Sequence, residues 1–150
     1  MLLPHTPPMR LVDEVVSIDP GRRATCRRVT HADDFFFQGH FPGEPVVPAI
    51  VLIELLAQTG GLAVGAPAEG EPHAPRALRV AAVDGFRFPA GCGPGVTLEA
   101  TARVVGRMGG LFKIEGTVTA SGTLVARGSI TLADAAGTAR SPSAPTHAPR

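Results

Sequence analysis

Apolar and polar residues alternate over three consecutive stretches in the second half of the chain, residues 96–105, 111–120 and 123–133. This period of two predicts strands that each turn one face toward a core. The residues expected on that face are Val96, Leu98, Ala100, Ala102 and Val104 in the first stretch, Phe112, Ile114 and Val118 in the second, and Leu124, Ala126, Ile130 and Leu132 in the third. Val125 is expected on the opposite, polar face.

Turn residues separate these strands from one another and from weaker ones before them. Glycine-rich breaks at 106–110 and 121–122 predict hairpin loops. The other expected elements are, in chain order, a strand over 11–18, a turn at Asp19-Pro20-Gly21, a weaker strand through Val29, and a strand over 77–88. The last of these is expected to lead into the later strands as one antiparallel meander.

The longest apolar segment begins near Pro48. Proline suits the first turn of a helix, because its missing N–H would have no partner there. The residues that follow, AIVLIELLAQTGGLAVG, are apolar on every side except at Glu54, Gln58 and Thr59. A helix that is apolar all round is a buried helix. The pattern therefore predicts an α+β fold, in which an antiparallel sheet of about five or six strands wraps around one long central helix.

A chain of 150 residues, 44% apolar and 18% charged, suits one globular domain, expected over residues 1–134. Residues 135–150 are small, polar and proline-rich, which predicts a disordered tail. Residues 65–76 are expected to form a loop.

The net charge, the interrupted apolar run and the cysteine spacing argue against several classes of function. Fourteen basic and thirteen acidic residues leave a net charge of +1, which argues against binding nucleic acid through bulk phosphate attraction. Pro48 and Glu54 interrupt the longest apolar run, so no membrane span of ~20 apolar residues is expected. Cys26 and Cys92 match no metal-ligand spacing. We expect a cytoplasmic protein with reduced cysteines, no metal, and neither a nucleic-acid nor a membrane partner.

Glu54 is the most unusual residue of the apolar helix. Desolvating a carboxylate is costly, so its side chain must find a partner, keep its proton or face a cavity. Gln58 lies one turn further on and shares its face. A second interpretation is that Glu54 lies on an exposed edge or pairs with an arginine such as Arg79 or Arg87, and the residues alone leave both open.

His40 lies in a segment stiffened by prolines, GHFPGEPVVP. Histidine titrates near neutral pH and can act as a general base, although a lone histidine is also often structural. The unpaired N–H groups at the helix start carry positive dipole and can polarise a carbonyl. Together these groups suit removal of a proton next to a carbonyl with loss of a β-hydroxyl. The remaining histidines are expected to be structural: His5, His31, His73 and His147.

At these residues the chain resembles the FabZ-type (3R)-hydroxyacyl-acyl carrier protein dehydratases. That family has a GHFPG loop, a P-V-x-P-G segment and a helix whose acidic residue lies fourteen positions after the loop histidine, the spacing of His40 and Glu54 here. LLPHTPPMRLVDEV, DDFFFQGHFPG, VDGFRF, PGVTLEA and FKIEG follow in the family's order, so the resemblance covers about residues 2–133.

The resemblance implies a hotdog fold and the dehydration of (3R)-hydroxyacyl thioesters on acyl carrier protein to trans-2-enoyl thioesters, in fatty-acid or related polyketide or polyene synthesis, with no cofactor. It implies a homodimer with shared active sites, which can assemble further into a trimer of dimers. His40 is then the base at C2, Glu54 of the neighbouring subunit the acid or water-orienting group at C3, and the Ala49 N–H the donor to the thioester carbonyl. Further substrate-binding residues are expected at Phe41, Gly43, Pro48, Ile50, Ile53, Gln58 and Phe88.

The chain departs from the family pattern at three places, one of which is Met9 and Arg10, where the family usually has apolar or aromatic residues. Ala49 stands where the family usually has glycine, and Pro89 and Ala90 stand where it tends to have arginines. Docking of an acidic carrier would then use other arginines, with Arg10, Arg79 and Arg87 as candidates. Two alternatives remain open from the sequence: a hotdog acyl thioesterase, and a non-catalytic partner subunit that binds acyl thioesters.

Overall fold

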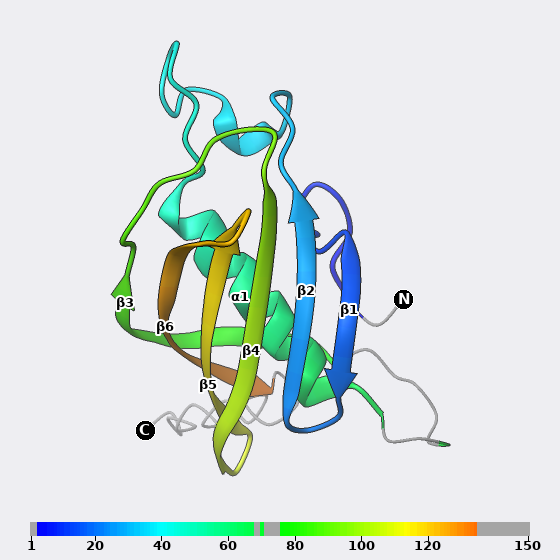
Figure 1. The fold of residues 1–150 in the computed structure, drawn as a ribbon. Helices are drawn as coiled ribbons and strands as arrows, with labels where there is room; N and C mark the ends of the chain where they lie inside the picture. The colour runs from blue at the N-terminus through cyan, green and yellow to red at the C-terminus, as the bar shows by residue number, and fades with distance from the viewer. Residues whose placement is uncertain (1–2, 68–69, 71–75, 135–150) are drawn as a thin grey trace, which may run out of the picture.

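The computed structural model describes residues 3–67, 70 and 76–134 (Figure 1). In chain order its elements are β1 (Glu14–Asp19), β2 (Arg23–Val29), the 3₁₀ turn η1 (Phe35–Phe37), α1 (Ala49–Gly65), β3 (Leu78–Arg87), β4 (Thr97–Met108), β5 (Leu111–Ala120) and β6 (Thr123–Asp134). The tail predicted over 135–150, His73, His147 and much of the loop predicted over 65–76 lie outside the described residues.

The strands form one antiparallel sheet in the order β1-β2-β4-β5-β6-β3. The predicted α+β fold, a sheet of five or six strands with one helix, is confirmed. The predicted meander is wrong at β3, which pairs with β6 at the far edge, where Val80 lies opposite Leu132. Residues 88–96 are too long for a tight hairpin. They are held instead by backbone hydrogen bonds to Val47 and Thr30, so β4 starts in the middle of the sheet.

The predicted alternation agrees with burial along β4 and β5. The residues buried on these two strands include Leu98, Ala100, Ala102, Phe112, Ile114 and Val118. In β6 the prediction is wrong at Val125, which is buried next to Ala126. The pairing with β5 passes directly from Ala126 to Leu124. Val125 is therefore the extra residue of a β-bulge, and two consecutive side chains of β6 face the core.

Two predicted boundaries also move. β4 continues to Met108, because Arg107 and Met108 pair with β5, and the predicted loop shrinks to a two-residue turn. β1 begins at Glu14 and not at residue 11, because the N–H of Leu11 donates to the Gln58 side chain on α1, at 2.9 Å, and not to a strand. The turn predicted at residues 19–21 is confirmed.

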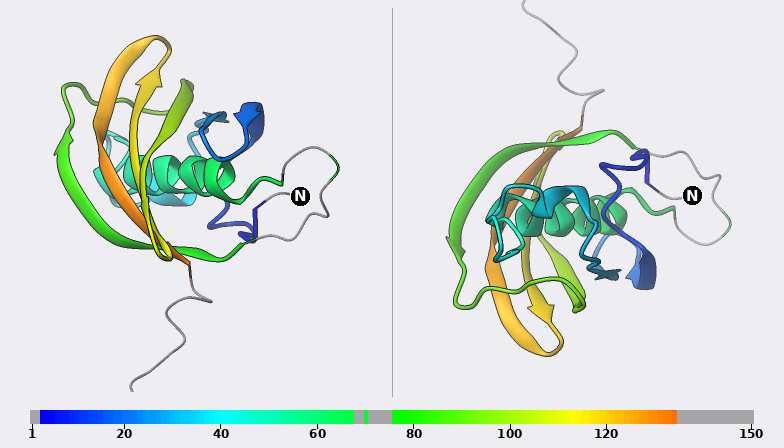
Figure 2. Two further views of the ribbon diagram at one scale, coloured as in Figure 1. Left: turned by 90° about the horizontal axis from the view of Figure 1, so that it is seen from below. Right: turned by 90° about the horizontal axis from the view of Figure 1, so that it is seen from above.

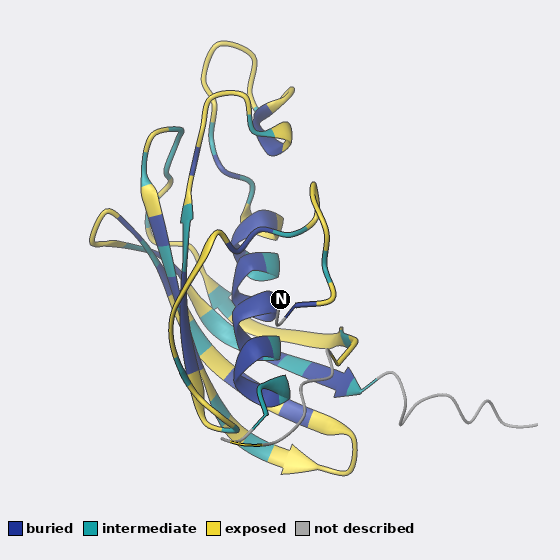
Figure 3. Cartoon of the chain, turned by 90° about the vertical axis from the view of Figure 1, so that its right-hand side faces the viewer, coloured by how far each residue is buried: buried dark blue, intermediate teal, exposed yellow. Residues whose placement is uncertain are grey.

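Helix α1 lies in the concave face of the curved sheet, as the end-on views show (Figure 2). Its sheet-facing residues Leu55, Leu56 and Leu62 are almost fully buried. The opposite side of the helix is only partly covered (Figure 3), and Ile50 near its start is 74% exposed. The apolar helix is therefore buried by its own sheet on one side and partly covered on the other.

Candidate active site

His40 lies in a loop that folds back on itself just before α1. The N–H of Phe41 donates to the carbonyl of Glu44 at 3.0 Å, and the N–H of Glu44 donates to the carbonyl of Phe41 at 2.9 Å. Gly39 and Gly43, on either side of the histidine, have φ angles of 76° and 75°. Glycine enters this left-handed region without steric cost. The two glycines of GHFPG therefore give the loop the shape that presents His40.

The imidazole of His40 has a defined orientation. Its Nδ1 lies 2.9 Å from the carbonyl oxygen of Val46. A carbonyl oxygen only accepts, so Nδ1 carries the hydrogen of this contact, and in the neutral ring Nε2 keeps its lone pair. The ring also stacks on Phe41, with 4.2 Å between ring centroids. His40 is therefore held in the tautomer that a general base acting through Nε2 requires.

The start of α1 presents free backbone donors next to this loop. The N–H groups of Val51 and Leu52 both donate to the carbonyl of Pro48, at 2.9 and 3.4 Å. Among the described residues, no backbone acceptor is bound by the N–H groups of Ala49 and Ile50. Because the first N–H groups of a helix carry its positive dipole, Ala49 offers a donor suited to a carbonyl oxygen or a developing enolate.

Glu54 lies one and a half turns into α1 and is half-buried. Its Oε1 accepts a hydrogen bond of 3.1 Å from Nε2 of Gln58 and lies 3.7 Å from Nε2 of His5. Neither Arg79 nor Arg87 forms an ion pair with it, so the arginine pairing considered from the sequence does not occur within the described chain. The polar pair that the helical spacing predicted, Glu54 with Gln58, is present.

Gln58 is 2% exposed, and each end of its carboxamide is engaged. Its oxygen accepts from the N–H of Leu11 at 2.9 Å, and its nitrogen donates to the carbonyl of Met9 at 2.7 Å as well as to Glu54. This side chain ties the opening segment of the protein to the helix. Its direct contact with a substrate stays a prediction.

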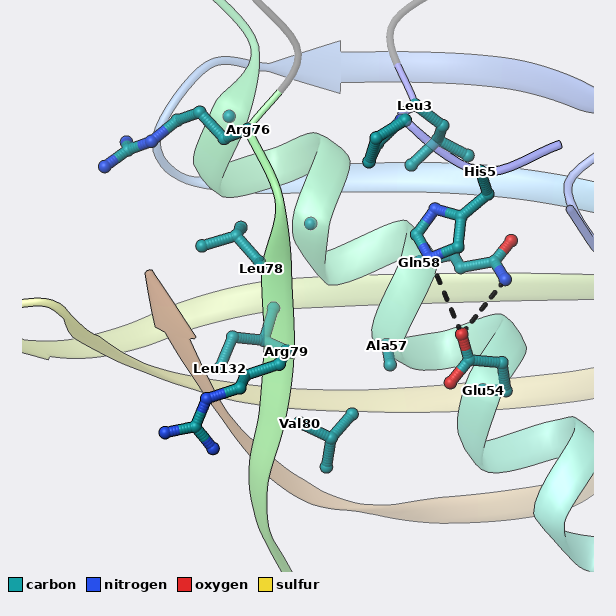
Figure 4. Close-up of a pocket in the computed structure, with 13 residues that line it drawn as sticks. Leu3, His5, Glu54, Ala57, Gln58, Arg76, Leu78, Arg79, Val80 and Leu132 are labelled. Carbon is teal, nitrogen blue, oxygen red and sulfur yellow. Dashed lines mark hydrogen bonds and ion pairs between the residues drawn. The ribbon is translucent and has the colours of Figure 1, made fainter. Parts of the chain in front are cut away.

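A pocket of about 280 Å³ opens between α1, β3, β6 and the opening segment (Figure 4). It is lined by Leu3, Pro4, His5, Glu54, Ala57, Gln58, Gly61, Gly65, Arg76, Leu78, Arg79, Val80 and Leu132. His40 does not line this pocket, and within the described chain it makes no hydrogen bond or ion pair with Glu54. One chain therefore presents the predicted base and the predicted acid at separate places.

The other predicted substrate-binding residues lie around the loop and the accessible side of the helix. Phe41, Gly43, Ala49, Ile50 and Phe88 are exposed, whereas Pro48 and Ile53 are half-buried. Phe88 stacks on Phe86, with 5.8 Å between ring centroids. None of the apolar residues of this set lines the pocket that holds Glu54, and their contacts with a substrate stay predictions.

His5 was expected to be structural, yet its Nε2 approaches Glu54 and its ring lines the pocket. Sequence reasoning missed this residue because His5 and Glu54 are far apart in the chain. The available signal was the position of His5 within the opening L-P-H motif.

The cysteines are poor candidates for a nucleophile. Burial raises the pKa of the Cys26 thiol, and a hydrogen bond with Thr59 opposes this only in part. Burial also raises the pKa of Cys92. A raised pKa leaves less of the reactive thiolate at neutral pH. In the part of the chain that is described, no three His, Cys, Asp or Glu side chains are grouped as a metal site requires, and no helix is long and apolar enough to cross a membrane.

Comparison with known proteins identifies the fold class of this protein. One helix in the concave face of a six-stranded antiparallel sheet is the hotdog fold. A solved structure, the dehydratase heterocomplex ApeI:P from Xenorhabdus doucetiae, matches with a TM-score of 0.77 at 20% identity, over 89% of this chain and 88% of that one. The predicted hotdog fold is therefore confirmed.

Sequence comparison defines the family within that class. The family model of the FabA-like domain matches residues 3–129, so the chain belongs to the FabA-like domain family. The 3-hydroxyacyl-(acyl-carrier-protein) dehydratase FabZ of Anaeromyxobacter sp. (strain Fw109-5) is 37% identical over 83% of this chain and 80% of its own length. The FabZ of Roseiflexus castenholzii is 33% identical over 88% of this chain and 90% of its own. The FabZ-type resemblance is confirmed.

Proposed function

We propose that the protein removes water from (3R)-hydroxyacyl thioesters, carried on acyl carrier protein, to give trans-2-enoyl thioesters, in fatty-acid synthesis or a related polyketide or polyene route. The two relatives described above are named as dehydratases, and this chain aligns with 80% and 90% of their length. The observation that carries the site assignment is the Nδ1 contact of His40 with Val46, which frees Nε2 for a proton.

Each group has one role in the proposed reaction. Nε2 of His40 takes the proton from C2 while the Ala49 N–H holds the thioester carbonyl oxygen, where charge develops. The C3–O bond then breaks, and the departing hydroxyl takes a proton from the Glu54 carboxyl and leaves as water. The electron pair of the C2–H bond becomes the new double bond. The proton on His40 returns to the Glu54 carboxylate through solvent, so the reaction needs no cofactor.

The base and acid of one site come from two subunits in this proposal. Support comes from β3, an edge strand of the sheet that also lines the Glu54 pocket through Leu78 and Val80. Unpaired edges favour association with another strand. Val80 and Val83 on this strand are 37% and 46% exposed. Pairing of two β3 strands would join the two sheets and bring the partner subunit next to Glu54. Trimers of such dimers and a cytoplasmic location remain predictions.

The proposed interface predicts that Val83→Asp produces monomers. A new carboxylate on this strand must lose water when the two edges pair, and it also repels its own copy where the two-fold axis passes close to residue 83. We expect size-exclusion chromatography with light scattering to show the dimer mass halved, with dehydration at least about 10-fold slower. Val105→Asp, at an exposed valine of β4, is the control and should stay dimeric and active. An active dimeric Val83→Asp protein would exclude β3 as the interface.

Product analysis separates dehydration from thioester hydrolysis. With a (3R)-hydroxybutyryl thioester we expect an enoyl thioester to accumulate, detected by its ultraviolet absorbance, while a thiol reagent detects no free thiol. We also expect the acyl carrier protein thioester to react at lower concentrations than the coenzyme A thioester. Release of thiol at the rate of substrate loss would instead identify a thioesterase.

A non-catalytic partner subunit is the second candidate. Two observations favour keeping it: the similar solved structure is named as a heterocomplex, and Ala49 occupies the place of the family's usual glycine. If the purified chain binds acyl carrier protein yet neither dehydrates the hydroxyacyl thioester nor hydrates the enoyl thioester, this candidate is correct and the dehydratase proposal is not.

A further inference from the structure

The opening segment, residues 3–11, is fixed against helix α1 beside Glu54. Leu3 at one end is buried. At the other end Met9 and Leu11 hydrogen-bond to the side chain of Gln58, at 2.7 and 2.9 Å. The N–H of Arg10 also donates to the carbonyl of Thr6 at 2.9 Å, which closes a turn between the two ends. His5 therefore belongs to a segment that is anchored on both sides of it.

The two oxygens of Glu54 have different environments. Oε1 is shared by Gln58 Nε2 at 3.1 Å and His5 Nε2 at 3.7 Å. Oε2 makes no hydrogen bond or ion pair with any described residue and points away from both (Figure 4). The arrangement holds one oxygen and leaves the other free to meet a ligand.

Among the described residues, the ring of His5 makes its one polar contact with Glu54. Its Nδ1 is buried without a hydrogen-bond partner in the described chain, and its Nε2 is the atom nearest Glu54. Buried polar side-chain atoms normally have a hydrogen-bond partner, so a histidine that only stabilised the fold would be expected to use Nδ1 as well. The guanidinium groups of Arg76 and Arg79, which belong to residues of the same pocket, point away from Glu54 (Figure 4). His5 is thus the one basic side chain of the pocket directed at this carboxyl.

We propose that His5 is a positioning residue for dehydration: its Nε2 and that of Gln58 together hold Oε1 of Glu54, so that Oε2 faces the C3 hydroxyl of the substrate. The proposal rests on the proposed function of Glu54. Gln58 is itself held by hydrogen bonds to the opening segment. This segment therefore orients the carboxyl group of Glu54 through two side chains, those of His5 and Gln58. Misplacing a reacting group by about 1 Å can cost up to about 100-fold in rate.

The test compares His5→Ala with His5→Gln. Alanine removes the contact, whereas the glutamine side-chain nitrogen can occupy nearly the place of the imidazole Nε2. With a (3R)-hydroxyacyl thioester, we expect His5→Ala to lower kcat about 10-fold and to change KM less than about 2-fold. His5→Gln should recover most of the lost kcat. His31→Ala, at an exposed histidine away from the pocket, is the matched control and should retain wild-type kinetics.

A double-mutant cycle with Glu54→Gln shows whether His5 acts through Glu54. If it does, His5→Ala should cause almost no further loss in the Glu54→Gln protein, because the group that it positions is already gone. An equal loss in both backgrounds, wild-type kcat in His5→Ala, or no recovery in a folded His5→Gln protein would each overturn the proposal. If His5→Ala does not fold, His5→Phe, which keeps an aromatic ring but has no ring nitrogen, replaces it in the cycle and should show the same losses.

Loss of the assigned role of Glu54 and loss of the assigned role of His5 give different experimental results. Glu54→Gln with wild-type kcat would refute the assigned role of Glu54 and, with it, this inference. A strongly impaired Glu54→Gln protein combined with an unimpaired His5→Ala protein would refute only the role of His5.

Discussion

Replacing Glu54 by glutamine is expected to slow dehydration by at least about 100-fold while the protein stays folded. The new carboxamide keeps the size of the side chain and can still accept the hydrogen bond from Gln58. It cannot donate an acidic proton to the departing hydroxyl, so the C3–O bond must break without acid assistance. Because Glu54 is half-buried on the pocket wall, bulk water is a poor replacement.

The measurement is kcat for a (3R)-hydroxyacyl thioester, followed by enoyl absorbance and paired with a melting curve. Glu115→Gln is a matched control, because Glu115 lies on the sheet surface and, within the described chain, its side chain forms one ion pair, with Arg103 at 3.4 Å. It should leave kcat unchanged. A Glu54→Gln protein with a normal rate would show that the C3 hydroxyl leaves without Glu54.

Replacing His40 by alanine is the second large change, with an expected loss of kcat of at least about 100-fold. The alanine protein lacks the imidazole whose Nε2 is proposed to take the proton from C2. Phe41 loses its stacking partner, but the loop keeps its backbone hydrogen bonds between Phe41 and Glu44. The expected fall is therefore in kcat and not in folding, measured by the same assay and melting curve. A normal rate in this variant would remove His40 from the mechanism.

Mixing the two inactive proteins tests whether the sites are shared. In a dimer of one His40→Ala chain and one Glu54→Gln chain, one shared site contains both intact residues and the other contains neither. Random reassortment of equal amounts should therefore restore about one quarter of the wild-type activity. Sites made within a single chain would stay inactive on mixing. The absence of restored activity, with mixed dimers demonstrated by mass, would contradict the shared site.

The sequence predicted accurately the elements that depend on residues close together in the chain. Helix α1 spans Ala49–Gly65, which coincides with the apolar run after Pro48. Strand β5 coincides with the alternating stretch 111–120. The glycines around His40 were visible as a GHFPG motif, and the pairing of Glu54 with Gln58 follows from the spacing of one helical turn.

The features that the sequence missed depend on contacts between distant parts of the chain. β3 pairs with β6 at the sheet edge, and the segment after β3 is hydrogen-bonded to Val47 and Thr30. Val125 is buried because β5 and β6 are out of step by one residue at a bulge. Periodicity describes one strand at a time, so it carries no information on which strand lies next to it or where their registers shift.

Apolar periodicity and short motifs are properties of neighbouring residues, so the amino-acid order was enough to predict the sheet-and-helix architecture, the family and the candidate acid and base. Two relations became visible in the folded chain alone: His5 of the opening segment approaches Glu54, and His40 lies outside the Glu54 pocket of its own chain. Both relations depend on how the opening segment and the edge strand β3 pack on α1. Local sequence patterns do not show how remote segments pack against one another.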